Sequence, residues 1–179
     1  MALCAYAAGV IDSDGSIGIL RETHAMRASR ATQPTFSERV TIRQIEPEAV
    51  DWLHGFFGGC RSVIAAKREK RQDLQSLQLV DRQATRLLAA TLPYLRIKRG
   101  QAALCLELRR LKEESRRARF ARGRGHRGGG KRPESISLAM ERVRSAIVEM
   151  NRIEGRAIRH STPSPLSSSD HPEEPNGPA

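Results

Sequence analysis

Two aspartates, Asp12 and Asp14, stand in the turn D-S-D-G that closes a short apolar segment near the start of the chain. Carboxylates at a helix end can bind a hard divalent cation, which polarises phosphate oxygens and lowers the pKa of a bound water. They can instead satisfy backbone donors of the turn, or begin an EF-hand calcium loop. The calcium interpretation fits poorly, because the required glycine is missing and the flanking pattern is helix then strand. A structural turn and a catalytic metal site remain as alternatives.

This acidic turn belongs to a strongly basic chain. The sequence has 179 residues, with 31 Lys and Arg against 20 Asp and Glu, for a formal net charge of +11. A surface of that charge favours a polyanionic partner, of which nucleic acid is the commonest, over a charge that is merely solvated. The length suits one domain with a modest core.

The cysteines and the apolar runs bear on where the protein works. Its 3 cysteines share no close spacing, so a disulfide framework or a zinc site is not expected. Residues 2–11 lack the basic flank of a signal peptide and run straight into Asp12, and no apolar run is long enough to span a membrane. We therefore expect an intracellular protein of a reducing compartment (cytoplasm, nucleoid or organelle), neither secreted nor membrane-bound.

The elements that must position the aspartates follow from periodicity and from helix start and stop signals. The alternating pattern of T-F-S-E-R-V-T-I-R puts one face of a strand in the core and leaves the other wet and cationic. The predicted order is α-β-β-α-β-β-α followed by helical additions, an α+β fold in one domain over residues 1–155. Residues 156–179 are expected to form a disordered tail, and the Arg/Gly-rich run 116–132 an unpacked loop. The predicted helices are 3–11, 46–57, 81–92, 100–115 and one after Pro133; the predicted strands begin at Ser16 and cover 35–43, 61–68 and 74–80.

The segment A-A-G-V-I-D-S-D-G, residues 7–15, resembles the nine-residue motif of the LAGLIDADG homing endonucleases, departing from it at Ala7, Val10 and Ser13. The resemblance covers roughly residues 3–155. It includes the order of the elements, the strand ending I-R-Q with Gln44, and the segment L-P-Y-L-R-I-K that ends in Lys98. It implies a fold in which an antiparallel sheet forms a saddle on DNA.

The resemblance also implies roles for individual residues. Asp14, with the carbonyl of Ser13, would hold Mg²⁺ or another divalent cation such as Mn²⁺. Gln44 would order the attacking water, and Lys98 would offset the developing negative charge. Of the two aspartates, Asp12 is interpreted as a structural residue of the turn.

A second copy of the chain is expected from the same resemblance. In the family two motif helices cross face to face, and close approach of backbones requires small side chains. The sequence contains no second D-x-D-G, so the other helix would come from a homodimer with a roughly palindromic site. The predicted dimer interface consists of Ala5, Ala8, Gly9 and Asp12.

Recognition of double-stranded DNA would come from the wet face of the sheet, laid along the major groove. In the connector of the second strand pair, Lys70 and Arg71 are expected to meet phosphates, which position without specifying. The remaining candidates for DNA contact are Glu22, His24, Arg27, Arg39, Thr41, Arg43, Lys67, Arg68, Ser76 and Gln78.

The resulting hypothesis is a site-specific, divalent-metal-dependent endonuclease that cuts both DNA strands as a homodimer, as homing endonucleases of introns do. The alternative is a non-cleaving nucleic-acid-binding protein on the same fold, either an intron RNA maturase or a transcription regulator. The departure at Ala7 and the Arg/Gly-rich run favour that alternative, whereas the presence of Asp14, Gln44 and Lys98 favours cleavage. A basic RNA-binding protein unrelated to the family would require the D-S-D-G turn to be a coincidence.

Overall fold

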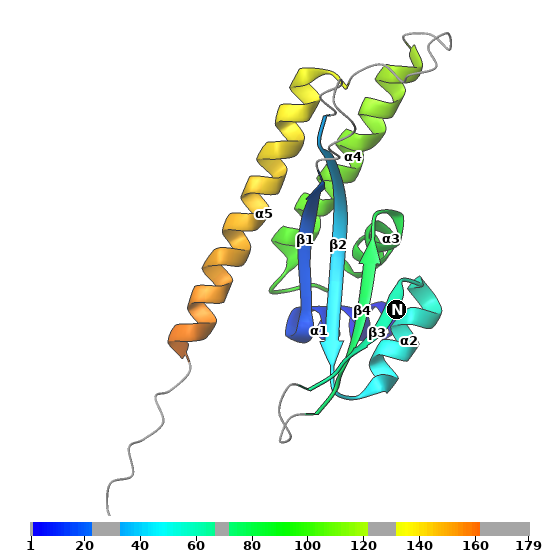
Figure 1. Cartoon of the computed structure of the whole chain (residues 1–179), viewed down its shortest axis with the longest axis vertical. Coiled ribbons are helices and arrows are strands. Elements are labelled where there is room, and N and C mark those ends of the chain that lie inside the picture. Colours follow the sequence, from blue (N-terminus) through cyan, green and yellow to red (C-terminus); the bar gives the residue numbers. More distant parts are fainter. Residues whose placement is uncertain (1, 23–32, 67–71, 122–131, 162–179) are drawn as a thin grey trace, which may run out of the picture.

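The computed structural model describes residues 2–22, 33–66, 72–121 and 132–161. Four antiparallel strands form one sheet in the order β1-β2-β4-β3. The described helices cover one face of this sheet and leave its other face open (Figure 1). This arrangement confirms the predicted α+β class. The elements are α1 (Ala2–Asp14), β1 (Gly15–Glu22), β2 (Thr35–Gln44), α2 (Pro47–Phe57), β3 (Cys60–Ile64), β4 (Leu74–Val80), α3 (Arg82–Thr91), α4 (Arg99–Ala121) and α5 (Glu134–Ser161).

The first helix passes into the first strand without a linker, because Gly15 follows Asp14 directly. A Cβ at Gly15 would lie 2.6 Å from the carbonyl oxygen of Ile11, well inside van der Waals contact. Glycine is therefore the residue that lets the chain reverse so tightly at this point. Asp14 is consequently held at the exact junction of α1 and β1.

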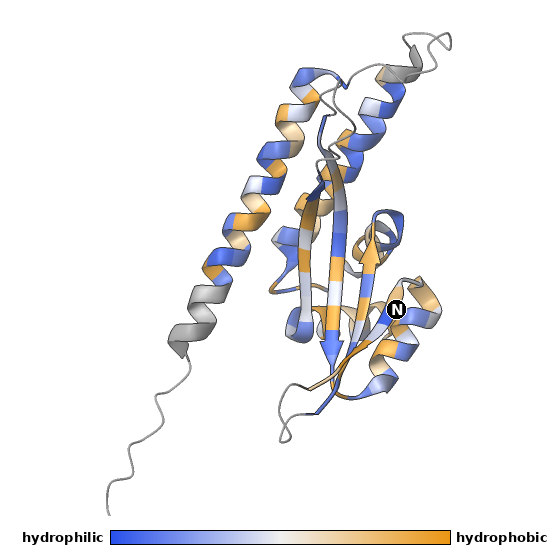
Figure 2. Cartoon of the chain, in the orientation of Figure 1, coloured by the Kyte–Doolittle hydropathy of each residue, from blue (hydrophilic) through white to orange (hydrophobic). Residues whose placement is uncertain are grey.

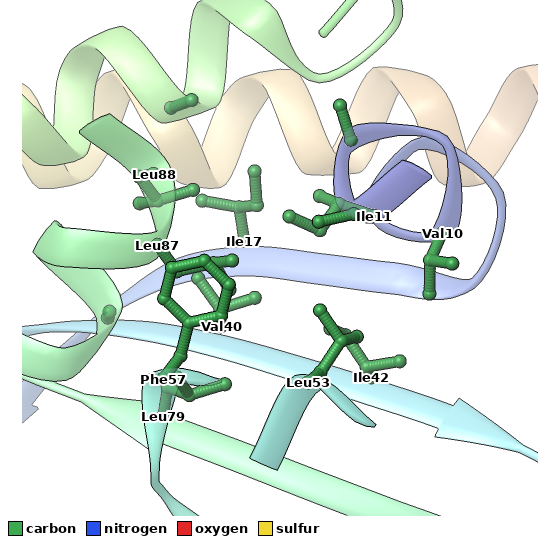
Figure 3. Close-up of a cluster of buried hydrophobic side chains, with 14 of the residues drawn as sticks. Val10, Ile11, Ile17, Val40, Ile42, Leu53, Phe57, Leu79, Leu87 and Leu88 are labelled. Atoms are coloured by element: carbon green, nitrogen blue, oxygen red, sulfur yellow. The ribbon is translucent and has the colours of Figure 1, made fainter. Parts of the chain in front are cut away.

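The strands alternate hydrophobic and hydrophilic residues, visible as bands along the sheet in Figure 2. Most of their buried side chains meet those of the helices in the cluster shown in Figure 3. Ile11 of α1, Ile17 of β1 and Val40 of β2 are each at most 1% exposed. The core therefore lies between the sheet and the helices, and α1 is anchored to the sheet by its buried side.

The second helix begins and ends where its sequence predicts. Pro47 occupies its first turn, and Gly58 and Gly59 follow its end with φ angles of 71° and 111°. Such angles favour glycine, and a Cβ at Gly59 would lie 2.8 Å from the carbonyl oxygen of Gln78. The two glycines thus set the turn from α2 into β3.

Several predicted boundaries were wrong. The helix α4 continues to Ala121, so residues 116–121 of the Arg/Gly-rich run are helical, and α5 continues to Ser161, past the predicted boundary at 155. Arginine is a good helix former, and the two helices support each other through Leu108, Leu111 and Met140. The strand β3 is shorter than predicted and ends at Ile64. The rest of the run and of the tail, 122–131 and 162–179, lies outside the described residues.

Asp81 was predicted to cap α3, and it does occupy the N-cap position before Arg82. Its side chain makes no capping hydrogen bond, and its backbone φ is 54°. The carboxylate turns instead toward α4, where it accepts hydrogen bonds from Arg109, at 2.7 Å, and from Lys112. Although burial raises the pKa of Asp81, these two cations lower it to about 2.

Candidate active site

The last residue of β2 reaches the last residue of α1. Along β2 the side chains of Val40 and Ile42 point into the core, and Gln44 continues that face by the two-residue period of a strand. Since α1 crosses this face at the end of the sheet, the Gln44 amide donates a hydrogen bond of 2.9 Å to Oδ2 of Asp14. The Ser13 hydroxyl donates to the same oxygen at 3.0 Å.

Asp12 points the other way, toward the connection between α3 and α4. Its carboxylate accepts hydrogen bonds from the backbone N–H groups of Arg96, at 2.8 Å, and Lys98, at 2.9 Å. Burial raises the pKa of Asp12, but the N–H groups of Arg96, Lys98 and Ile97 and the charge of Lys98 outweigh it, and the pKa lies below its usual range. The carboxylate also stands at the start of α4, where a helix favours negative charge. Asp12 therefore ties this connection to the end of α1.

The connection in turn delivers Lys98. Its ammonium donates hydrogen bonds of 2.8 Å to the carbonyl oxygens of Ile11 and Asp12, in the last turn of α1. These carbonyls are groups that a helix leaves without partners, and a cation there also suits the helix dipole. Burial lowers the pKa of Lys98, while the charges of Glu154, Asp12 and Asp14 act in the opposite direction. Lys98 is thus a half-buried cation held one turn behind Asp14.

The C-terminal helix contributes neighbours that the sequence did not reveal. Asn151 of α5 donates a hydrogen bond of 2.9 Å to the carbonyl of Ile17 in β1. Glu154 accepts one from the buried Gln101 of α4 and exerts its charge on Lys98. Sequence signals could not find these residues, because the contact depends on how α5 packs back across β1 and α4.

Five of the candidate DNA-contact residues lie accessible on the open face of the sheet. Thr41 of β2 pairs with Gln78 of β4, and Arg39 and Arg43 flank Thr41 on the same face. Glu22, at the end of β1, is exposed on this face too. Ser76 lies on the same face, opposite Arg43, but it is only 6% exposed, so its hydroxyl has little access to a partner. The remaining candidates, His24, Arg27, Lys67, Arg68, Lys70 and Arg71, lie outside the described residues.

The outer side of α1 carries small residues. Ala5 and Gly9 are exposed, and a Cβ at Gly9 would meet no atom of the chain within 4 Å. Ala8, predicted to share this side, is only 1% exposed and packs in the chain's own core, because it falls on the buried stripe of the helix. The predicted interface therefore reduces to Ala5, Gly9 and the half-buried Asp12.

Two shallow hollows flank this side of α1, and they differ in charge. One is lined by Tyr6, Ala49, Trp52 and the exposed Glu48, with Tyr6 and Trp52 in edge-to-face contact at 5.2 Å. The other contains exposed arginines, and its lining consists of Ala5, Gly9, Asp12, Pro93, Tyr94, Leu95, Arg96 and Arg99. We call these the acidic hollow and the basic hollow.

The oxygen atoms at the end of α1 suit a hard cation. The side chain of Asp14 is exposed, and the exposed Ser13 offers a backbone carbonyl beside it. Carboxylate and carbonyl oxygens are the ligands that Mg²⁺ and Mn²⁺ prefer. Within the described ranges, no group of three or more His, Cys, Asp or Glu side chains could hold a metal by itself.

No protein-family model matches the sequence, and no curated protein matches it by sequence. In the part of the chain that the structure describes, no helix is both long and apolar enough to cross a membrane.

The fold does match solved structures. The chain superimposes on the homing endonuclease I-CvuI, solved with a DNA target and Mg, with a TM-score of 0.57 and 18% identity over 82% of this chain and 80% of I-CvuI. For the LAGLIDADG homing endonuclease I-GzeII, in complex with DNA, the TM-score is 0.53 and the identity 11%, over 97% of this chain and 54% of I-GzeII. I-SmaMI, bound to uncleaved DNA in the presence of calcium ions, gives 0.52 and 15% over 96% and 54%. These likenesses confirm the resemblance predicted from the D-S-D-G segment: the chain has the fold of the LAGLIDADG homing endonucleases.

Proposed function

We propose that the protein is a divalent-metal-dependent endonuclease that cuts both strands of DNA as a homodimer. The observation that carries this proposal is the convergence of Asp14, Gln44 and Lys98 at one end of α1. The three residues come from α1, β2 and the connection before α4, and the hydrogen bonds described above place all three around the last turn of one helix. The fold shared with structures solved on DNA supports the same reading.

The chain's own groups have distinct parts in this mechanism. Asp14 and the Ser13 carbonyl would hold Mg²⁺, which would neutralise phosphate charge and make a bound water more acidic. Gln44 holds the Asp14 carboxylate in one orientation and has an amide oxygen left to align a water. Lys98 supplies a fixed positive charge close to the reacting phosphate, preorganised by two carbonyls.

Homodimerisation is supported by the outer side of α1. One exposed carboxylate binds Mg²⁺ weakly, whereas Asp14 and its copy in a partner could share cations with DNA phosphates. Gly9 and Ala5 would let the two α1 helices approach closely. Moreover, this chain aligns with only 54% of I-GzeII, so a structure of that size would require two copies.

The proposed symmetry has a further consequence for the two hollows. If the twofold axis of the dimer runs parallel to α1, the hollow on one side of α1 in one protomer lies opposite the hollow on the other side of α1 in its partner. The acidic hollow with Glu48 would then face the basic hollow with Arg96 and Arg99. This charge complementarity supports the symmetric arrangement.

The open face of the sheet would read the DNA. Its accessible polar side chains include Arg39, Thr41, Arg43 and Gln78, and arginine and glutamine can bond two atoms of one base. A dimer would present this face twice, so the expected site is long and roughly palindromic.

One observation favours the alternative, a nucleic-acid-binding protein that does not cleave. The Lys98 ammonium is already engaged by two carbonyls of α1, which is sufficient to explain it as a helix-end cap. On that interpretation the lysine stabilises the fold and has no chemical role.

The deciding experiment selects cleaved sites from a randomised duplex DNA library with Mg²⁺, using the wild type and Asp14→Asn. We expect the wild type to yield a palindromic consensus and Asp14→Asn to bind the same sequence without cutting. Sequence-specific binding with no Mg²⁺-dependent cutting by either protein would overturn the nuclease proposal in favour of the binding protein.

A further inference from the structure

A cavity of about 650 Å³ lies away from α1, at the end of the molecule where α4 and α5 meet (upper part of Figure 1). It is bounded by the start of β2, the first turn of α3, the second half of α4 and the start of α5. Its apolar floor consists of Phe36 and Met140, and its walls are largely charged or hydroxylic. The other lining residues are Thr35, Ser37, Asp81, Arg82, Thr85, Arg109, Lys112, Glu113, Ser115, Arg116 and Arg132.

Two of the lining cations are already neutralised. Glu38, whose side chain is fully buried behind the cavity, accepts hydrogen bonds of 2.9 Å from both Arg109 and Lys112. The same two cations bind Asp81, with 2.7 Å between Arg109 and the carboxylate. Two positive and two negative charges thus cancel in one cluster, as burial demands.

The remaining charge on the lining is positive. Arg82 and Arg116 are exposed and form no ion pair within the described residues, and Arg132 lies with its guanidinium 5.8 Å from the centre of the Phe36 ring. Against Arg82 and Arg116, which form no such pair, stands one acid, Glu113. The lining therefore keeps an excess of positive charge that an anion would balance.

A buried hydroxyl points to a ligand independently of the charge. Ser115 is only 2% exposed, yet its hydroxyl has no hydrogen-bond partner among the residues that the structure describes. A buried polar group without a partner costs free energy, so such groups normally meet a bound molecule or an ordered water. Ser115 lines the cavity one residue before Arg116, on the same helix.

We propose that this cavity binds a phosphate group, with Arg82, Arg116 and the Ser115 hydroxyl as its principal partners. A terminal phosphate carries close to two negative charges at neutral pH and a DNA phosphodiester carries one, and guanidinium groups bind the oxygens of either in pairs. The hydroxyls of Ser37 and Ser115 supply donors that a tetrahedral anion can use in addition. The apolar floor leaves space for an organic group attached to the phosphate.

The phosphate could belong to a free phosphorylated small molecule or to the backbone of DNA. The first source is independent of the proposed function, whereas the second rests on it. Thr35 and Ser37 belong both to this cavity and to the open face of the sheet, so DNA that continues past the end of β2 would pass the cavity mouth.

The test is calorimetric titration of the full-length protein with inorganic pyrophosphate at constant ionic strength. We expect saturable binding that weakens about 10-fold in Arg82→Gln and in Arg116→Gln, because each loses a charge-assisted hydrogen bond. Ser115→Ala should weaken it less. The matched control is Arg110→Gln, a neighbour on α4 that pairs with Glu107 and Glu114 on the exposed side. Absence of saturable binding, or equal binding by all four variants, would overturn the proposal.

A second measurement separates the two sources. The affinity for a long DNA duplex is determined with and without saturating pyrophosphate. Competition identifies the phosphate as one of DNA, whereas unchanged DNA affinity with pyrophosphate bound identifies a free phosphorylated ligand. A protein that binds pyrophosphate as expected but no DNA would contradict the proposed function and leave the phosphate site intact.

Discussion

The side-chain amide of Gln44 donates a hydrogen bond of 2.9 Å to Oδ2 of Asp14, which joins the last residue of β2 to the last residue of α1. The Ser13 hydroxyl donates to the same oxygen. One oxygen of the carboxylate is therefore fixed from two sides. A carboxylate held in this way has lost most of its rotational freedom before any cation binds, which is the usual role of hydrogen bonds around metal ligands.

The first prediction concerns Gln44→Leu. Loss of the amide should lower the single-turnover cleavage rate about 10- to 100-fold at saturating DNA, since a hydrogen bond to a charged group contributes about 1.5–3 kcal/mol. Thermal stability should change little, because the Asp14 side chain is exposed. Gln78→Leu, on the open face, serves as the control and should weaken DNA binding rather than cleavage. An unchanged cleavage rate in Gln44→Leu would show that Gln44 has no part in the activity of the site.

The second prediction concerns Asp12→Asn. The variant should lose about 1–2 kcal/mol of unfolding free energy at pH 7, because a charged acceptor for the backbone N–H groups of Arg96 and Lys98 is lost. The pKa of Asp12 is lowered in the folded state, so its contribution is present above the unfolded value near 3.8 and is lost as the pH falls through the folded value.

Urea unfolding at several pH values measures this difference. The difference in unfolding free energy between the wild type and Asp12→Asn should become smaller under acid conditions, because the wild-type carboxylate is then protonated. Asp51→Asn is the control: its ion pair with Arg61 is exposed on both sides, and it should cost less than about 1 kcal/mol. A gap independent of pH would show that the charge of Asp12 is not what anchors the connection.

The third prediction compares Gly15, at the start of β1, with two glycines inside helices, Gly9 of α1 and Gly55 of α2. Gly15→Ala should destabilise the protein by about 1–3 kcal/mol, because its Cβ would press on the backbone of Ile11. Gly9→Ala and Gly55→Ala meet no atoms within 4 Å and should each raise the stability of the monomer by up to about 1 kcal/mol. Thermal unfolding at low protein concentration checks all three, and a neutral Gly15→Ala would contradict the tight junction.

The same glycines test the dimer. Gly9→Leu should weaken self-association by at least about 10-fold in sedimentation equilibrium, because a large side chain would separate the two α1 helices. Gly55→Leu, on α2, should leave self-association unchanged. Equal dimer constants for both variants would place the interface elsewhere.

The fourth prediction concerns the two hollows. Glu48→Arg or Arg96→Glu alone should weaken the dimer by placing like charges opposite each other, and the double variant should recover most of the loss. The side chains of Glu48 and Arg96 are both exposed in the single chain, so folding should be unaffected. Failure of the double variant to recover would reject the orientation of the dyad along α1.

The fifth prediction concerns Glu154→Gln. Burial lowers the pKa of Lys98, and the charge of Glu154 is the first of the effects that oppose it. Without that charge the pKa of Lys98 should fall further, so the alkaline limb of the cleavage profile should move to lower pH. Glu149→Gln, whose ion pair with Arg152 is exposed, is the control and should not move the limb. If the alkaline limb of the cleavage profile stays in place in Glu154→Gln, the charge of Glu154 does not influence activity through Lys98.

Local patterns were enough for most of the fold. The alternation in β2, the proline and glycines around α2 and the D-S-D-G turn each lie within a few consecutive residues, and each reflects a local backbone or burial requirement. The ends of helices were harder to predict from sequence where packing between distant elements determines them. The arginine-rich end of α4 is helical because α5 packs against that helix, and composition alone does not contain that contact.

The chemical groups of the site, Asp14, Gln44 and Lys98, could be named from the sequence, because their segments follow one another in the order of a known fold. How these groups meet depends on the packing of the whole chain. The crossing of α1 over the sheet brings Gln44 to Asp14, Asp12 ties down the connection that carries Lys98, and α5 adds Glu154. Residues separated by 30 to 87 positions in the chain become hydrogen-bonded neighbours through packing. Hydrophobic burial drives that packing, and it involves residues from distant parts of the chain, so no short motif contains the information.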